Sequence, residues 1–241
     1  MGKRHDTESP GGEEKPADRM KREAGYYAAD MVGDGMVVGL GTGSTVGYTM
    51  ERLSDRIREG LRIQGVPTSF QAEIRARELH IPLTTLDDYP ELDMAIDGAD
   101  QVDDRLRLIK GRGAALTREK CVAASAEELV IVIDASKCTG VLDAPVPVEV
   151  IPFALQPVML GIRAVGGEPV LRIGVQKDGP VITDNGNVII DCSFGVIANP
   201  DHLEGLISLM PGVLSCGLFC EFVEKTTVIV GRTDGCTELT R

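Results

Sequence analysis

Apolar runs of strand length alternate with longer amphipathic segments between residues 18 and 134. This rhythm predicts alternating strands and helices, and such strands form a parallel sheet that helices cover on both faces. The predicted helices are 18–32, 46–58, 69–79 and 117–126. The predicted strands are 36–40, 61–66, 81–85, 92–96 and 129–133.

The pattern changes after a proline-marked linker at 143–147. Strands are predicted at 148–151 and 169–175, helices at 155–165 and 201–210, and a hairpin with an Asn-Gly turn at 181–191. The last apolar runs, 213–219 and 226–230, are expected to return to the first domain. The predicted fold is α/β: a Rossmann-like parallel-sheet domain with helices on both faces, plus a smaller α+β (ferredoxin-like) domain. The expected division is a disordered tail at 1–16, a catalytic domain at 17–142 and 213–241, and a small domain at 143–212.

Composition excludes several classes of protein. No apolar run reaches membrane-spanning length, and the charged N-terminus lacks a signal-peptide apolar region, so we expect a cytoplasmic protein without a membrane partner. The net charge of −12 argues against nucleic acid, and any anionic substrate must be held by local positive charge. The 6 cysteines form no C-x-x-C pair and the 3 histidines are isolated, so we expect free thiols and no metal site.

A glycine-rich turn, Gly41-Thr42-Gly43-Ser44-Thr45, joins a predicted strand to a predicted helix. Backbone N–H groups and the helix N-terminus make such a turn suitable for a phosphate group. The dinucleotide fingerprint fails at Val46 and the Walker lysine is absent, so a phosphate monoester fits better than a nucleotide. The alternative is that Ser44 or Thr45 simply caps the helix.

The segment from Asp97 to Lys120 concentrates chemical groups. It contains two aspartates, Asp97 and Asp100, then Lys110 before a glycine turn, then Glu119 on a predicted helix. Carboxylates can transfer protons and a lysine can stabilise an oxyanion. The alternative is a solvated acidic loop followed by an ordinary surface helix.

Three polar loops follow predicted strands: 41–45, 97–100 and 134–137. Because ligands of parallel α/β sheets bind outside the carboxyl ends of the strands, we expect these loops to meet at one site.

The chain's motifs, taken together, resemble those of ribose-5-phosphate isomerase of the A type. In chain order they are GLGTGST at 39–45, DGAD at 97–100, KGRGAALTREK at 110–120, DASK at 134–137, PVEVIP at 147–152, ITDNGN at 182–187 and PGVLSCGLF at 211–219. Two departures are Arg112, where many members have glycine, and Gln101, where glutamate is common. The resemblance implies interconversion of D-ribose 5-phosphate and D-ribulose 5-phosphate, in the non-oxidative pentose phosphate pathway, by a homodimer or homotetramer without metal or cofactor.

The resemblance also implies residue roles. Glu119 matches the proton-transferring base, and Asp97 and Asp100 match substrate-binding aspartates, with Asp97 also implicated in ring opening. The other implied binding residues are Thr42, Gly43, Ser44, Thr45, Gly98, Ala99, Lys110, Gly111, Arg112, Gly113, Lys137 and Lys21.

The residue types suit this chemistry independently of the resemblance. Isomerisation through an enediolate needs one base, a donor or cation for the enediolate oxygens, and an acid–base group for ring opening. Glu119, Lys110, and Asp97 or Asp100 can supply these functions. Other readings are a sugar-phosphate-sensing domain of a transcriptional regulator, a coenzyme A transferase with a glutamate nucleophile, or a sugar-phosphate deaminase.

Overall fold

The structure is a computed structural model that describes residues 14–241. Residues 1–13 of the predicted tail lie outside the described residues, and Pro16 already belongs to the first helix. The α-helices are α1 (Pro16–Met31), α2 (Ser44–Arg58), α3 (Phe70–Glu78), α4 (Leu116–Ser125), α5 (Leu155–Ala164) and α6 (Pro200–Ser208). The short 3₁₀ helices are η1 (Ala135–Lys137), η2 (Pro152–Ala154) and η3 (Val223–Lys225).

The main sheet has 6 strands in the order β13-β12-β6-β3-β1-β2. These strands are β1 (Val37–Leu40), β2 (Gln64–Pro67), β3 (Leu92–Asp97), β6 (Ala126–Asp134), β12 (Thr226–Arg232) and β13 (Gly235–Leu239). All of them run parallel except β13, which pairs antiparallel with β12 at the edge. The chain order reverses at β1 and β3, and ligands of open α/β sheets bind at such a switch point.

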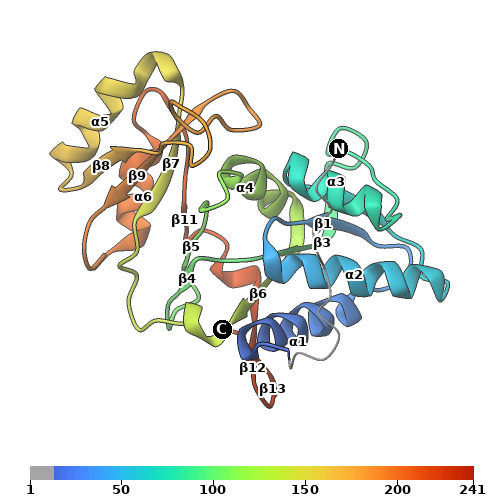
Figure 1. The fold of residues 1–241 in the computed structure, drawn as a ribbon. Helices are drawn as coiled ribbons and strands as arrows, with labels where there is room; N and C mark the ends of the chain where they lie inside the picture. Colours follow the sequence, from blue (N-terminus) through green and yellow to red (C-terminus); the bar gives the residue numbers. More distant parts are fainter. Residues whose placement is uncertain (1–13) are drawn as a thin grey trace.

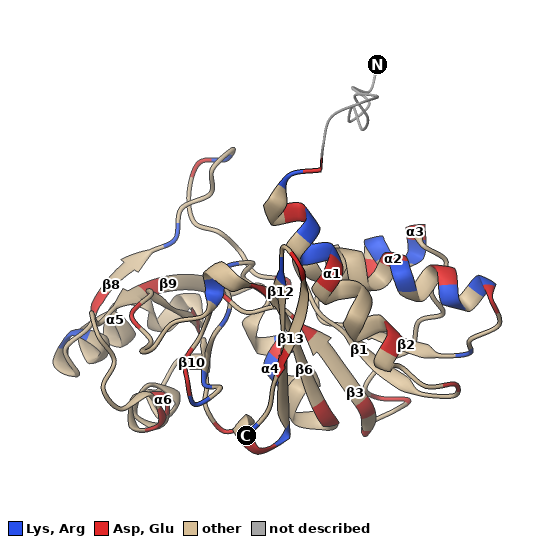
Figure 2. Cartoon of the chain, turned by 90° about the horizontal axis from the view of Figure 1, so that it is seen from below, with Lys and Arg blue, Asp and Glu red and all other residues tan. Residues whose placement is uncertain are grey.

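Helices cover both faces of the main sheet, as the apolar strands require. Small and aliphatic side chains of α1, α2 and α3 pack with β1, β3 and β6 on one face. On the other face α4 packs with the sheet, together with the segments around Leu108 and Phe219. Charged residues of both signs intermingle along α1, α2 and α3, whereas the strand interiors are largely uncharged (Figure 2). The predicted parallel-sheet architecture is therefore confirmed.

A second, antiparallel sheet has 4 strands in the order β10-β7-β9-β8 and lies beside the main sheet (Figure 1). Its strands are β7 (Val146–Val150), β8 (Glu168–Leu171), β9 (Val188–Ser193) and β10 (Val213–Cys216). With α5 and α6 its chain order is β-α-β-β-α-β, which is the ferredoxin-like arrangement. Its core includes Val148, Ile162, Ile190 and Ile207. We propose that residues 143–216 form a domain, called the small domain below.

A stretch predicted as one strand, 213–219, is two strands in the structure. Its first half, β10, pairs with β7, and its second half, β11 (Leu218–Phe219), joins β5 (Leu108–Ile109) and β4 (Gln101–Val102) in a 3-stranded sheet. The break falls at Gly217, whose carbonyl accepts the N–H of Lys110 and whose N–H donates to Pro147. The small domain therefore includes β10, and our boundary lies four residues beyond the one predicted from sequence.

Two other predicted elements differ from the structure. The strand at 81–85 is only a bridge between Leu83 and Gly65, because Pro82 has no N–H to donate. In the predicted hairpin the turn is present, with Gly186 at φ 81°, but the first arm is one bridge between Ile182 and Val188. The second arm, β9, pairs instead with β7 and β8.

Candidate active site

A cavity of about 530 Å³ opens at the carboxyl ends of β1, β3 and β6. It lies at the switch point, where the three polar loops predicted from sequence meet. The predicted site residues that line it are Lys21, Thr42, Gly43, Ser44, Thr45, Gly98, Ala99, Asp100, Lys110, Gly111, Arg112, Gly113, Glu119 and Lys137. Asp97 does not line the cavity but contacts Lys110 at its base.

The glycine-rich turn ends at Gly43, the residue that caps α2, with φ 125°. The N-cap residue is a glycine, which has no side chain, and Ser44 and Thr45 already lie inside the helix. The alternative that Ser44 or Thr45 serves as the cap is therefore wrong. The first N–H groups of α2 therefore face the cavity without a side-chain acceptor, and they carry the partial positive charge of a helix N-terminus. Lys21 from α1 and Lys137 from η1 line the same cavity and add positive charge.

Asp97 joins the turn at 41–45 to the loop at 97–100. Its Oδ1 accepts the N–H of Thr42 at 3.1 Å and that of Gly98 at 2.8 Å. A side chain at position 41 would lie 2.7 Å from the Asp97 Cα, so only glycine allows this approach. The Thr42 hydroxyl is also hydrogen-bonded to the hydroxyls of Thr68 and Ser69, at 3.0 and 2.6 Å.

Three buried charged side chains meet below the cavity. Lys110 Nζ lies 3.0 Å from Asp97 Oδ2 and 3.1 Å from Glu119 Oε2, and these side chains are only 3 to 5% exposed. The Glu119 Oε2 atom accepts no hydrogen bond of good geometry from any residue between 14 and 241. A buried carboxylate oxygen that is held by an ion pair rather than by a well-formed hydrogen bond is unusual, and it suits a group that exchanges protons with a ligand.

The charges of this cluster shift its pKa values in a defined way. Burial, reinforced by the negative charge of Asp97, raises the pKa of Glu119 to about 7, although Lys110 opposes the shift. Burial alone would lower the pKa of Lys110, but the charges of Asp97 and Glu119 outweigh it and raise that pKa. Lys110 therefore stays cationic, while Glu119 is poised to take up and release a proton near neutrality.

Asp100 lies at the wall of the cavity and is held by the backbone. Its Oδ2 accepts the N–H of Arg112 at 3.0 Å, and its own N–H donates to Ile109. The Arg112 side chain is exposed. Position 112 therefore contributes a backbone amide to the aspartate, as glycine also would.

Several cavity residues were not among the predicted site residues. They are Ala17, Val46, Gln71, Val132, Ile133, Asp134 and Ser136. Asp134 and Ser136 belong to the DASK motif, where Asp134 Oδ1 accepts the Ser136 N–H at 3.0 Å, so a sequence signal existed for them. Gln71 had none, because α3 reaches the cavity only through the tertiary fold.

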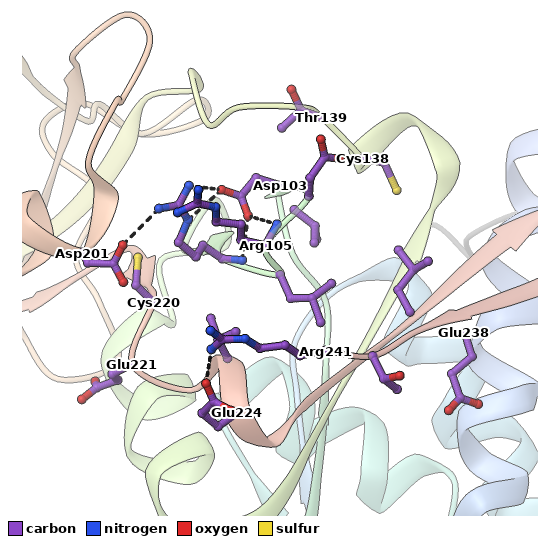
Figure 3. Close-up of a pocket in the computed structure, with 17 residues that line it drawn as sticks. Asp103, Arg105, Cys138, Thr139, Asp201, Cys220, Glu221, Glu224, Glu238 and Arg241 are labelled. Carbon is purple, nitrogen blue, oxygen red and sulfur yellow. Dashed lines mark hydrogen bonds and ion pairs between the residues drawn. The ribbon is translucent and has the colours of Figure 1, made fainter.

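A larger cavity, about 740 Å³, lies elsewhere, between the β4–β5 segment and the C-terminus (Figure 3). None of the predicted site residues lines it. Several of its charged side chains pair with one another: Arg107 with Asp103 and Asp201, and Arg241 with Glu224.

Residues 14–241 contain no helix long and apolar enough to cross a membrane. In the same part of the chain, no group of three or more His, Cys, Asp or Glu side chains is arranged to hold a metal ion.

Comparison with known proteins identifies the family. Residues 64–235 match the family model described as ribose 5-phosphate isomerase A (phosphoriboisomerase A). The chain belongs to this family. The ribose-5-phosphate isomerase A of Methanoregula boonei is 57% identical over 220 residues, which are 91% of this chain and 93% of the relative. That of Natronomonas pharaonis is 52% identical over 89% of this chain and 94% of the relative.

Solved structures of the family have the same fold. Ribose 5-phosphate isomerase A from Methanocaldococcus jannaschii superposes with a TM-score of 0.88 at 45% identity, covering 92% of this chain and 98% of that one. A D-ribose-5-phosphate isomerase in complex with phospho-erythronic acid gives 0.90 at 43% identity, covering 93% and 99%. The resemblance noted in the sequence is thus confirmed. The chain is an aldose–ketose isomerase that interconverts ribose 5-phosphate and ribulose 5-phosphate in the pentose phosphate pathway, not a sensing domain, a coenzyme A transferase or a deaminase.

Proposed function

We propose that Glu119 moves a proton between C2 and C1 of the open-chain sugar phosphate while Lys110 stabilises an enediolate. The observation that carries this proposal is the ion pair between the buried Oε2 of Glu119 and Lys110 Nζ, which lie 3.1 Å apart, with no hydrogen bond of good geometry to Oε2 from the described residues. The residue lines the cavity, and its raised pKa suits a base near neutral pH.

The proposed reaction needs one proton carrier and one fixed cation. Glu119 takes the C2 proton of the aldose, the C–H electrons form the C1–C2 double bond, and O1 becomes negative. Lys110 neutralises that charge. The O2 hydroxyl proton passes to O1, and Glu119 returns its proton to C1, which leaves a carbonyl at C2. Exchange of the C2 proton with solvent deuterium, followed by NMR, tests this scheme.

Ring opening comes before this step, and we propose that Asp100 assists it. The residue types left the choice between Asp97 and Asp100 open, and the resemblance implicated Asp97. Asp97 is occupied by two backbone amides and by Lys110, whereas Asp100 lines the cavity. Asp97 would then hold Lys110 and the phosphate turn in place, and Asp100 would exchange a proton with the anomeric hydroxyl.

We propose that the substrate phosphate binds at the N-terminus of α2, between Lys21 and Lys137. The N–H groups of this helix have no side-chain acceptor among the described residues, and both lysines line the cavity. A net charge of −12 makes such local positive charge necessary for an anionic substrate.

Lys137→Ala is expected to raise KM more than it lowers kcat. The lysine would contact a part of the substrate that does not react, and binding felt equally in the ground and transition states appears in KM. Steady-state kinetics of ribulose 5-phosphate formation measure both constants. Lys177→Ala, at an exposed lysine outside the cavity, is the matched control. A large fall in kcat with unchanged KM would place Lys137 at the reacting carbons instead.

The raised pKa of Glu119 predicts a pH dependence of stability. The folded protein holds this proton more tightly than the unfolded chain, so between pH about 4.5 and about 7 the contribution of Glu119 to the free energy of unfolding falls as pH rises. Urea unfolding at several pH values should show this slope in the parent relative to Glu119→Gln. A ¹³C NMR titration of the carboxylates, with the same variant for assignment, measures the pKa directly. Identical slopes, or a Glu119 pKa near 4.5, would contradict the expectation.

We also propose that the enzyme is a homodimer or homotetramer in the cytoplasm. The small domain exposes large apolar side chains, including Phe153, Val175 and Leu209, which a second copy could cover. The cysteines are free thiols, which fits a reducing compartment. Sedimentation equilibrium, with Phe153→Ser as the perturbing variant, tests the assembly.

A further inference from the structure

The helix that carries the proposed base lies between the two sheets. Helix α4 contacts β3 and β6 of the main sheet and β7 and β10 of the small domain (Figure 1). Glu119 points from it toward Lys110 and the cavity. The neighbouring side chains Thr117, Arg118 and Lys120 instead contact residues that are distant in sequence, and most of these belong to the small domain.

Thr117 is bound to a buried carboxylate of the small domain. The Thr117 hydroxyl donates to Oε2 of Glu149, a residue of β7 that is fully buried. The other donors to this carboxylate come from the turn at 183–187: Thr183 Oγ1 at 2.7 Å, Asn187 Nδ2 at 2.9 Å and Asn185 Nδ2 at 3.1 Å. Buried charge is costly unless it is hydrogen-bonded, so this network is expected to be rigid.

The basic residues on either side of Glu119 make similar contacts. The Arg118 guanidinium donates to Asn185 Oδ1 at 2.9 Å and to the Asp184 carbonyl at 3.0 Å. Lys120 Nζ donates to Glu204 of α6 and, at 2.7 Å, to the Leu218 carbonyl. The side chains on both sides of Glu119 are therefore anchored outside α4.

The chain that enters α4 does not set the helix direction by itself. Ala114 has φ 61°, a left-handed conformation that costs a non-glycine residue energy and persists only where its surroundings enforce it. No side chain of the described residues caps α4. Arg172, which is paired with Asp191 in the small domain, donates to the carbonyls of Gly111 and Arg112 at 3.0 Å. The turn before the base is thus also held by the small domain.

We infer that Glu149 is a positioning residue for the isomerase reaction: through Thr117 it holds α4 in the orientation that aims Glu119 at Lys110. Glu149 does not line the cavity, so any effect on the reaction must pass through α4. The inference rests on the proposed function, in which Glu119 is the base. On this inference the small domain contributes to the reaction by positioning the base, because most residues that anchor α4 and the turn before it lie in that domain.

The test replaces Thr117 with valine, which keeps the shape and removes the hydroxyl. Because small misplacements of catalytic groups cost up to about 10²-fold, we expect kcat to fall by roughly 10- to 10²-fold with little change in KM. We also expect the pKa of Glu119 to rise further, because Lys110 lowers it in the parent and the two groups would separate. Thr117→Ser should restore both values, since it retains the donor.

The matched control is Thr226→Val. Thr226 is buried, whereas Thr117 is half-buried; like Thr117 it donates its hydroxyl in one hydrogen bond, here to the Phe222 carbonyl at the end of β12 away from the cavity. It should lose stability in urea without changing kcat or the Glu119 pKa. If Thr117→Val does not fold, Glu149→Gln is measured in its place, with the same expected direction for kcat and for the pKa.

The outcomes separate this inference from the proposed function. If Glu119→Gln abolishes activity while Thr117→Val keeps the parental kcat and Glu119 pKa, the positioning role is wrong and the base assignment stands. If Glu119→Gln stays active, the base assignment itself fails. Adding Thr117→Val to Glu119→Gln should not reduce the residual rate further. A further reduction of the same size as in the parent would show that Thr117 does not act through Glu119, and would overturn the inference.

Discussion

Replacing Glu119 with glutamine is expected to lower kcat by about 10²- to 10⁴-fold while substrate binding survives. Glutamine keeps the size of the side chain but cannot accept a proton from C2, and general base catalysis contributes about this factor. The effect should be large here because the Glu119 carboxylate is buried beside Lys110, and burial together with the charges of Asp97 and Asp100 raises its pKa toward neutrality.

The deciding measurement is exchange of the C2 proton of ribose 5-phosphate with solvent deuterium, because it reports proton removal apart from product release. Glu128→Gln is a suitable control, since Glu128 is an exposed glutamate at the opposite end of β6. If Glu119→Gln exchanges and isomerises at nearly the parental rate, Glu119 is not the base. Asp97 or Asp100 would then have to take that role.

Replacing Lys110 with methionine is expected to damage both activity and stability. The enediolate would lose its cation, and removal of one oxyanion-stabilising group typically costs about 10²- to 10³-fold in kcat. Asp97 and Glu119 would remain buried without their shared cation, and breaking a buried pair in this way costs roughly 3–5 kcal/mol. The pKa of Glu119 should also rise further, because Lys110 opposes its shift.

Kinetics at a temperature where the variant is folded, together with urea unfolding, separate these two effects. The double variant Lys110→Met/Glu119→Gln should regain part of the lost stability, since it removes one of the uncompensated carboxylates. Lys225→Met is a control, because Lys225 donates to the Ala124 and Ala126 carbonyls at the end of the sheet away from the cavity. A Lys110→Met enzyme with parental kcat would exclude Lys110 as the group that stabilises the enediolate.

The sequence by itself predicted the features that depend on local pattern. The alternation of apolar strands and amphipathic helices predicted the parallel sheet and a glycine turn after β1, although α2 begins at Ser44, two residues before the predicted helix. The helix predicted at 69–79 is α3, and Ser69 caps it by accepting the Ala72 N–H. The candidate site was also accessible from sequence, because Asp97, Lys110 and Glu119 lie within one short segment and the carboxyl ends of parallel strands must meet.

Tertiary structure alone decided which distant segments meet. An apolar pattern marks which residues are buried but not which partners they pair with, so the division of 213–219 into β10 and β11 had no signal in the sequence. For the same reason the environment of Glu119 could not be predicted. Its pKa depends on burial and on charges that only folding brings near, and the Thr117–Glu149 and Lys120–Glu204 contacts join residues 32 and 84 positions apart. Local pattern thus determined the elements and the reactive residues, whereas packing between the two sheets determined how the proposed base is held.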